Sequence, residues 1–86
     1  MSSLENLRED INNIDRDILT KLKDRLNLAK EVAEAKKELG QNIEDKSREE
    51  QLRLFHKDNA DELDLDYDFV TSLFILIIEE SKKAQS

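Results

Sequence analysis

Residues 4–39 read LENLREDINNIDRDILTKLKDRLNLAKEVAEAKKEL, and neither glycine nor proline interrupts them. Apolar residues recur every three or four positions from Leu4 and Leu7 onward, which is the spacing of one face of an α-helix. The two serines before Leu4, with Glu5 after them, fit a capping box, and Gly40 fits a C-terminal cap. The sequence therefore predicts one very long helix over about residues 4–39.

The predicted helix is too long for the rest of the chain to cover. At about 1.5 Å per residue it is about 54 Å long, whereas a compact domain of this size is only about 30 Å across. Its overhanging half still carries apolar residues along one face, among them Ile11, Ile14 and Ile18. We therefore predict that a second copy of the chain covers this face in an obligate, intertwined homodimer.

The rest of the chain predicts two shorter helices. After a short connection, Asp45 is suited to cap a helix over about residues 46–59. The acidic residues 58–64 are expected to form a loop, and a third helix is expected over about residues 65–84. The expected fold is all-α, with three helices per chain in a single domain that spans residues 1–86.

Apolar periodicity also predicts which side chains of the shorter helices face inward. In the second helix these are Leu52 and Phe55. The inward stripe of the third helix begins at Val70 and ends on two polar residues, Ser81 and Gln85, whose spacing places them on the same face.

The composition disfavours several classes of protein. The chain has no cysteine, so no disulfide framework is expected, and its single histidine, His56, is expected to be a surface residue that binds no metal. A net charge of −7 disfavours nucleic acid and anionic membranes as partners. The longest apolar run, residues 74–78, is too short to span a bilayer, and the N-terminus shows no secretion signal. We expect a cytoplasmic protein without a cofactor.

Two cations, Arg25 and Lys36, lie within the apolar face of the long helix. An unpaired buried cation costs several kcal/mol, so each needs a protein carboxylate or an anionic ligand. The two residues are about 16 Å apart along the axis and within roughly 20° of the same face. Leu28, Ala29 and Val32 would form an apolar floor between them. This spacing suits a small anion, and the alternative is that the cations reach water or pair with neighbouring carboxylates.

The polar residues on inward faces suit the binding of a small dianion. Arg8 lies about 25 Å from Arg25 on a different face, so the two can meet over one ligand only in an antiparallel dimer. The sequence has no nucleophile beside a base, no phosphate loop and no metal motif. Any catalysis would then rest on charge stabilisation and conformational restraint. The inward polar set is Arg8, Arg25, Lys36, Arg48, Glu49, Ser81 and Gln85.

These residues, in this order and spacing, resemble the all-helical chorismate mutases, and the resemblance covers nearly the whole chain. A small departure is Asn42, which stands where that family often has a proline. The matching features are LREDINNID at 7–15, Arg25, Leu28 and Ala29, Val32, Lys36, Gly40, Ile43, Asp45, Arg48 and Glu49, LFILIIEES at 73–81, and Gln85.

The resemblance implies a role for each cation of the set. Arg8 would come from the partner subunit and, with Arg25, bind the two carboxylates of chorismate. Lys36 would contact a carboxylate and the ether oxygen of the bond that breaks. Gln85 would donate to the same oxygen, and Arg48 would support the carboxylate network.

The resemblance also assigns the remaining substrate-binding residues. Asp45 and Glu49 would hold the substrate hydroxyl, Ser81 would add a further hydrogen bond, and Val32 would line the pocket. The implied reaction is the [3,3] rearrangement of chorismate to prephenate in aromatic amino-acid biosynthesis.

Two alternatives remain at the level of sequence. One is an isochorismate-pyruvate lyase on a similar scaffold, although Glu49 directly after Arg48, and Ser81 four residues before Gln85, favour the mutase. The other is a non-enzymatic helical dimerisation module, in which the seam cations pair with carboxylates across the dimer.

Overall fold

The protein is built from three helices, which confirms the predicted all-α fold in the part of the chain that the structure describes. The structure is a computed structural model that describes residues 3–42 and 45–85, without the side chain of Gln85. Helix α1 spans Leu4–Glu38, α2 spans Lys46–Glu62 and α3 spans Tyr67–Gln85. None of these helices has both the length and the apolar character needed to cross a membrane.

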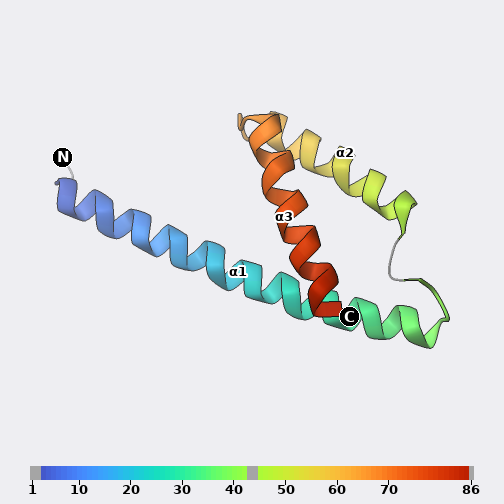
Figure 1. Cartoon of the computed structure of the whole chain (residues 1–86). Helices are drawn as coiled ribbons and strands as arrows, with labels where there is room; N and C mark the ends of the chain where they lie inside the picture. Colours follow the sequence, from blue (N-terminus) through green and yellow to red (C-terminus); the bar gives the residue numbers. More distant parts are fainter. Residues whose placement is uncertain (1–2, 43–44, 86) are drawn as a thin grey trace.

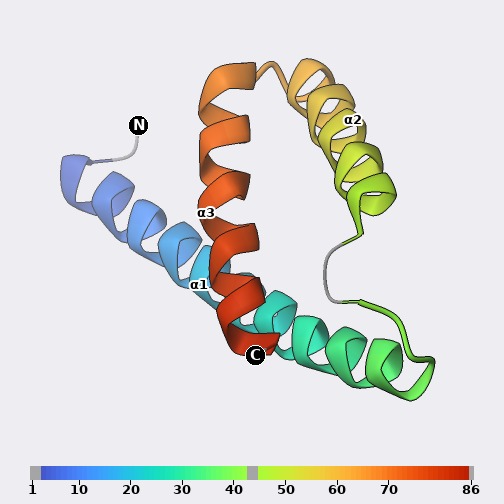
Figure 2. The ribbon, with the colours of Figure 1, turned by 45° about the vertical axis from the view of Figure 1, so that its right-hand side comes forward.

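Helix α3 is the element that joins the other two. It crosses the C-terminal half of α1, and α2 packs along α3 rather than on α1 (Figures 1 and 2). The N-terminal half of α1 extends away from both shorter helices, so the molecule measures 57 × 24 × 16 Å. A site that uses all three helices can therefore form only near the crossing of α1 and α3.

Local signals in the sequence set both ends of α1. The N-cap is Ser3, whose side chain accepts a hydrogen bond from the backbone N–H of Asn6 at 3.1 Å. Glu5 is thus the second helical residue rather than the third, and the predicted capping box is wrong in this detail. At the other end Gly40 has φ 71°. The backbone N–H of Gln41 donates to the carbonyl of Lys36 at 2.7 Å, which completes the expected glycine cap.

Helix α2 begins at its predicted cap and ends later than expected. The carboxylate of Asp45 accepts a hydrogen bond from the backbone N–H of Arg48 at 3.1 Å. The loop predicted over residues 58–64 is wrong, because the helix continues through Ala60, which is 1% exposed. The helix ends at Glu62, and two residues later Asp64 takes a left-handed conformation with φ 56°. Short polar residues tolerate that conformation better than most others.

Helix α3 starts slightly later than the predicted residue 65. Asp66 precedes the helix, and its carboxylate accepts a hydrogen bond from the backbone N–H of Phe69 at 2.9 Å. This contact satisfies one of the free amides of the first turn. The inward stripe of α3 is as expected in the described side chains, with Val70 and Ser81 buried.

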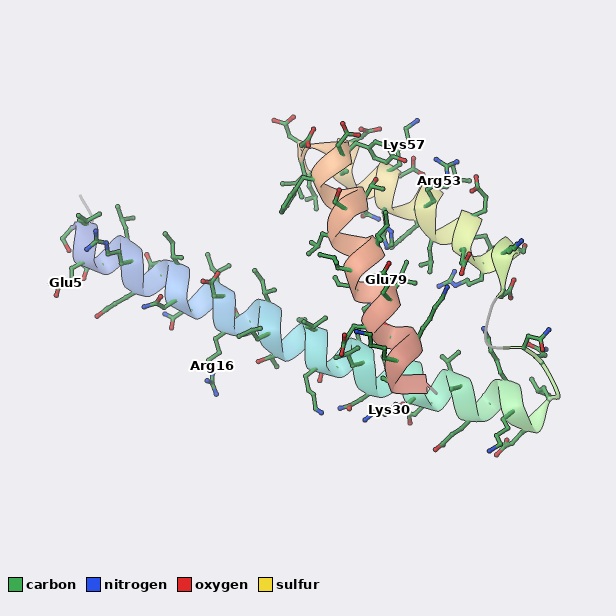
Figure 3. The ribbon with its side chains drawn as sticks, in the orientation of Figure 1. Glu5, Arg16, Lys30, Arg53, Lys57 and Glu79 are labelled. Atoms are coloured by element: carbon green, nitrogen blue, oxygen red, sulfur yellow. The ribbon has the colours of Figure 1, made fainter. Side chains whose placement is uncertain are left out.

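The single chain has very little interior. Helix α1 has no buried residue, and its seam is open to solvent, with Ile18 58% exposed. Phe55, predicted to face inward, is exposed as well. Side chains along the first half of α1, Glu5 and Arg16 among them, project into open space (Figure 3). The radius of gyration is 16.3 Å, against about 12 Å for a compact domain of this length.

His56 forms the main aromatic contact between α2 and α3. Its ring stacks on Phe74 with centroids 3.7 Å apart and planes at 17°, so the expectation of a surface histidine is wrong. Burial, together with the nearby positive charges of Arg25 and Arg48, lowers the pKa of His56 below its ordinary value. The folded chain therefore favours the neutral imidazole.

Replacing Gly40 by alanine is expected to lower the free energy of unfolding by about 1 kcal/mol, because a side chain with a Cβ resists the left-handed conformation. Among the residues that the structure describes, none places an atom within 4 Å of the position that this Cβ would take, so they add no steric cost. Urea denaturation at fixed protein concentration measures the change. Gly40→Asn should lose less, and equal stability of all three proteins would contradict the assigned conformation.

Acidification from pH 7 to about 5.5 is expected to destabilise the fold in part through His56. In the unfolded chain His56 binds a proton near the ordinary pKa of histidine, about 6.5. In the folded chain its pKa is lowered, so its imidazole stays neutral down to a lower pH. Stability from this residue is thus present above about pH 6.5 and is lost as the pH falls. His56→Phe keeps an aromatic ring, and urea titrations across this range should show a shallower pH dependence for it. Identical slopes in both proteins would refute the assignment.

Candidate functional site

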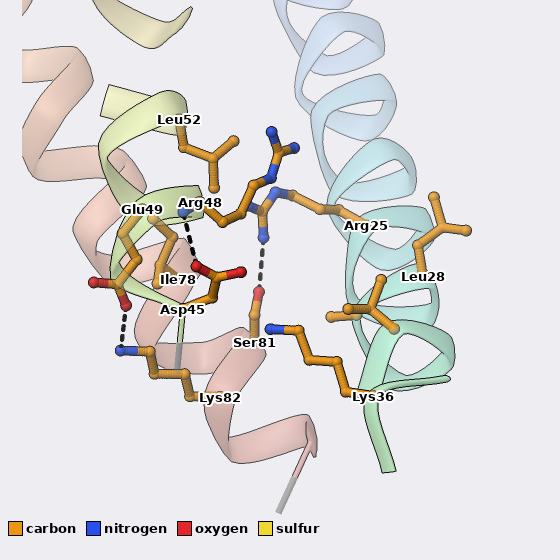
Figure 4. Close-up of a pocket in the computed structure, with 12 residues that line it drawn as sticks. Arg25, Leu28, Lys36, Asp45, Arg48, Glu49, Leu52, Ile78, Ser81 and Lys82 are labelled. Carbon is orange, nitrogen blue, oxygen red and sulfur yellow. Dashed lines mark hydrogen bonds and ion pairs between the residues drawn. The ribbon is translucent and has the colours of Figure 1, made fainter. Parts of the chain in front are cut away.

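A pocket of about 290 Å³ opens where the second half of α1, the start of α2 and the end of α3 come together (Figure 4). Each helix supplies part of the wall, so no single segment of the sequence contains the site. Its lining residues are Arg25, Leu28, Ala29, Val32 and Lys36 from α1, Asp45, Arg48, Glu49 and Leu52 from the start of α2, and Ile78, Ser81 and Lys82 from α3.

The structure brings together most of the residues that the sequence singled out. Arg8 and Gln85 are not among the residues that line the pocket. Arg8 is exposed near the far end of α1, and the side chain of Gln85 lies outside the described residues, although its backbone ends α3. The residues that line the pocket as a group are Arg25, Val32, Lys36, Asp45, Arg48, Glu49 and Ser81.

Arg25 is held in the pocket by α3. Its Nη1 donates to the hydroxyl oxygen of Ser81 at 2.7 Å, and that hydroxyl donates its proton to the carbonyl of Ile77 at 2.8 Å. Ser81 is 6% exposed, so this chain of hydrogen bonds is shielded from water. The serine thus orients the guanidinium and leaves its other N–H groups available to a ligand.

A second polar contact joins α2 to α3. Lys82 Nζ lies 3.1 Å from Glu49 Oε1, and in Figure 4 the lysine extends toward α2, on the opposite side of the pocket from Arg25. The side chain of Lys36 enters from α1 and points toward Ser81 in the same view.

Positive charge dominates the pocket although the whole chain carries −7. Four cations and two carboxylates line it, which leaves an excess of two positive charges. Burial, and then the positive charge of Arg48, lowers the pKa of Arg25 below its ordinary value. Two guanidinium groups held this close favour an anion between them, which would relieve their mutual repulsion.

The floor of the pocket is apolar. It is lined by Leu28, Ala29 and Val32 of α1, with Leu52 of α2 and Ile78 of α3, so a ligand here would have a nonpolar body and at least one anionic group. Among residues 3–42 and 45–84, no group of three histidine, aspartate or glutamate side chains is placed to hold a metal ion.

Sequence reasoning overlooked Lys82 as a member of the site. The available signal was its position four residues after Ile78, on the face of α3 that the apolar stripe marks as inward. Its contact with Glu49 could not be foreseen, because the contact depends on how α2 lies against α3.

Comparisons with known proteins agree over nearly the whole chain. The family model described as chorismate mutase type II matches residues 7–86. A chorismate mutase of Methanocaldococcus jannaschii is 33% identical over 85 residues, covering 99% of this chain and 86% of that protein. A bifunctional chorismate mutase/prephenate dehydratase of Buchnera aphidicola is 38% identical over 84 residues.

The match to the Buchnera protein covers very different shares of the two chains. The match covers 98% of this chain but only 22% of the Buchnera protein, so the chain spans about a fifth of that relative. The family match, by contrast, includes α1 from residue 7 onward, all of α2 and α3, and every residue that lines the pocket. This chain belongs to the chorismate mutase type II family.

Proposed function

We propose that this protein is a chorismate mutase, which isomerises chorismate to prephenate by a [3,3] rearrangement. The observation that carries the proposal is the convergence of Arg25, Lys36 and Arg48 over an apolar floor. Family membership and the relatives named chorismate mutase support the choice of reaction. A dimerisation module would have no need for a pocket with excess positive charge.

Conformational restraint is the first part of the proposed mechanism. The reaction breaks a carbon–oxygen bond while a carbon–carbon bond forms, so the substrate must fold into a compact shape. Guanidinium groups bind carboxylates through paired, directional hydrogen bonds. Arg25, already oriented by Ser81, and Arg8 of a second copy would hold the two substrate carboxylates in positions that only the compact conformer satisfies. Arg48 would support this network.

Charge stabilisation is the second part. Negative charge grows on the ether oxygen as the bond stretches, so a fixed cation there binds the transition state more tightly than the substrate. We assign this role to Lys36, with Gln85 as a second donor. Lys36 lies in the last turn of α1, where its carbonyl accepts the 2.7 Å hydrogen bond from Gln41 that closes the helix end.

A homodimer is part of the same proposal. The chain exposes 7394 Å², roughly 2,100 Å² above the value of about 5,300 Å² that a folded monomer of its mass would show. That excess is comparable to the surface that each chain buries in an obligate dimer. The exposed seam of α1, with Leu7 and Ile11, would supply the apolar part of the interface. Arg8 lies on this half of α1 and would enter the pocket of the partner.

Lys36→Ala is expected to lower kcat at least about a hundredfold, the scale of removing one preorganised electrostatic donor. Steady-state assays with chorismate measure the change, with isochorismate as a second substrate to test for lyase activity. Lys37→Ala is the matched control, because Lys37 is exposed and does not line the pocket. A near-normal rate for Lys36→Ala would refute its role.

Mixing two inactive variants tests the contribution of Arg8 across subunits. When Arg8→Ala and Arg25→Ala chains are refolded together, half of the dimers are mixed, and each mixed dimer has one intact site if Arg8 acts in its partner. Activity should therefore recover to about a quarter of the wild-type value. Mixing Arg8→Ala chains with chains that carry both Arg8→Ala and Arg25→Ala should restore no activity, because neither chain supplies an Arg8. If Arg8 acts within its own chain, neither mixture recovers.

A further inference from the structure

Lys82 is the one cation of the pocket to which the mechanism above gives no task. It lies on α3 directly after Ser81, and its ammonium is paired with Glu49 of α2 at 3.1 Å. The two side chains are 39% and 42% exposed, so the pair is neither deeply buried nor freely solvated. It links two helices at the edge of the candidate site.

The Lys82–Glu49 pair also separates two hollows. Glu49, Ile78 and Lys82 line the pocket already described, and they also line a second hollow of about 350 Å³ between α2 and α3. The second hollow is lined further by His56 and Phe74, whose stacked rings join the same two helices. The ion pair is therefore part of the wall between the two spaces, with Glu49 Oε1 3.1 Å from Lys82 Nζ.

The family resemblance implies that Glu49 binds the substrate hydroxyl, which presents an electrostatic difficulty in a pocket that binds a dianion. A carboxylate that accepts a hydrogen bond from the substrate hydroxyl must lie close to two substrate carboxylates, and like charges at such distances repel. A cation on the far side of Glu49 reduces this repulsion. It also fixes the carboxylate in one orientation, so that less rotational freedom is lost when substrate binds.

We infer that Lys82 is a positioning residue, which orients the Glu49 carboxylate toward the substrate and offsets its charge. This inference rests on the proposed function of the site. Lys82 acts through Glu49 and does not touch the ligand, because its ammonium points to α2 and away from Arg25 (Figure 4). The substrate hydroxyl keeps the same contact before and during the rearrangement, so the effect falls on binding rather than on the chemical step.

The test is a double-mutant cycle of Lys82→Met and Glu49→Gln, read by kcat, KM and the Kd of an oxabicyclic dicarboxylate that mimics the compact conformer. Lys82→Met should raise KM and Kd about fivefold and change kcat less than about twofold. In the Glu49→Gln background the same change should alter KM and Kd less than about twofold, because the carboxylate that Lys82 orients is gone. Lys82→Arg should restore most of the affinity.

Lys83→Met is the matched control. It removes the same charge from the neighbouring position, but Lys83 is 77% exposed, pairs with Glu80 and does not line the pocket. Its KM and Kd should match the wild type. Thermal unfolding of every variant checks the fold, with Lys82→Gln in reserve if Lys82→Met does not fold.

Two outcomes would overturn the inference. If Lys82→Met weakens binding equally with Glu49 and with Gln at that position, Lys82 contacts the ligand directly. If it does not weaken binding at all, the ion pair has no part in recognition. A wild-type protein that binds the dicarboxylate but does not convert chorismate would instead refute the proposed function, while the binding cycle would still measure the role of Lys82.

Discussion

The length of α1 is the constraint on which the rest of this structure depends. A helix of 35 residues cannot be covered by α3, which has 19 residues and crosses its second half, while α2, with 17 residues, packs on α3. The crossing with α3 lies in the second half of α1, and the half-buried side chains of α1 all fall between Leu22 and Lys36. That half contributes to the pocket, and the other half leaves an apolar seam exposed. The candidate site and the proposed dimer thus follow from one geometric imbalance.

The pocket gathers positive charge because separate local structures fix each cation. Arg25 is oriented by a serine from α3, Lys36 lies in a helical turn closed by Gly40, and Arg48 sits in the first turn of α2 behind the Asp45 cap. None of these supports relies on a ligand. The repulsion between these cations is overcome when the chain folds. The cations are therefore already in position before an anion binds.

The sequence allowed the local features to be predicted better than the tertiary ones. Periodicity and Gly40 predict α1, and Asp45 predicts the start of α2, because each signal acts within a few residues. The acidic residues 58–64 led to the prediction of a loop, but aspartates also suit the exposed face of a helix, and α2 continues through Ala60. The stacking of His56 on Phe74 depends on the rotation of α2 against α3, which no local pattern specifies. Phe55 has inward spacing, but the described part of the chain leaves it 62% exposed.

The uneven distribution of charge affects how a dianion reaches the pocket. The residues outside it carry a net charge of −9, because the lining contributes an excess of two positive charges to a total of −7. The net negative charge repels an incoming dianion at long range, whereas the excess positive charge of the lining attracts it near the pocket, which narrows the productive routes of diffusion. At about 0.1 M salt, mobile ions screen both effects at separations beyond about 10 Å. Ionic strength therefore acts on capture of the substrate in two opposing ways, and their balance is set by how far the acidic surface extends around the mouth.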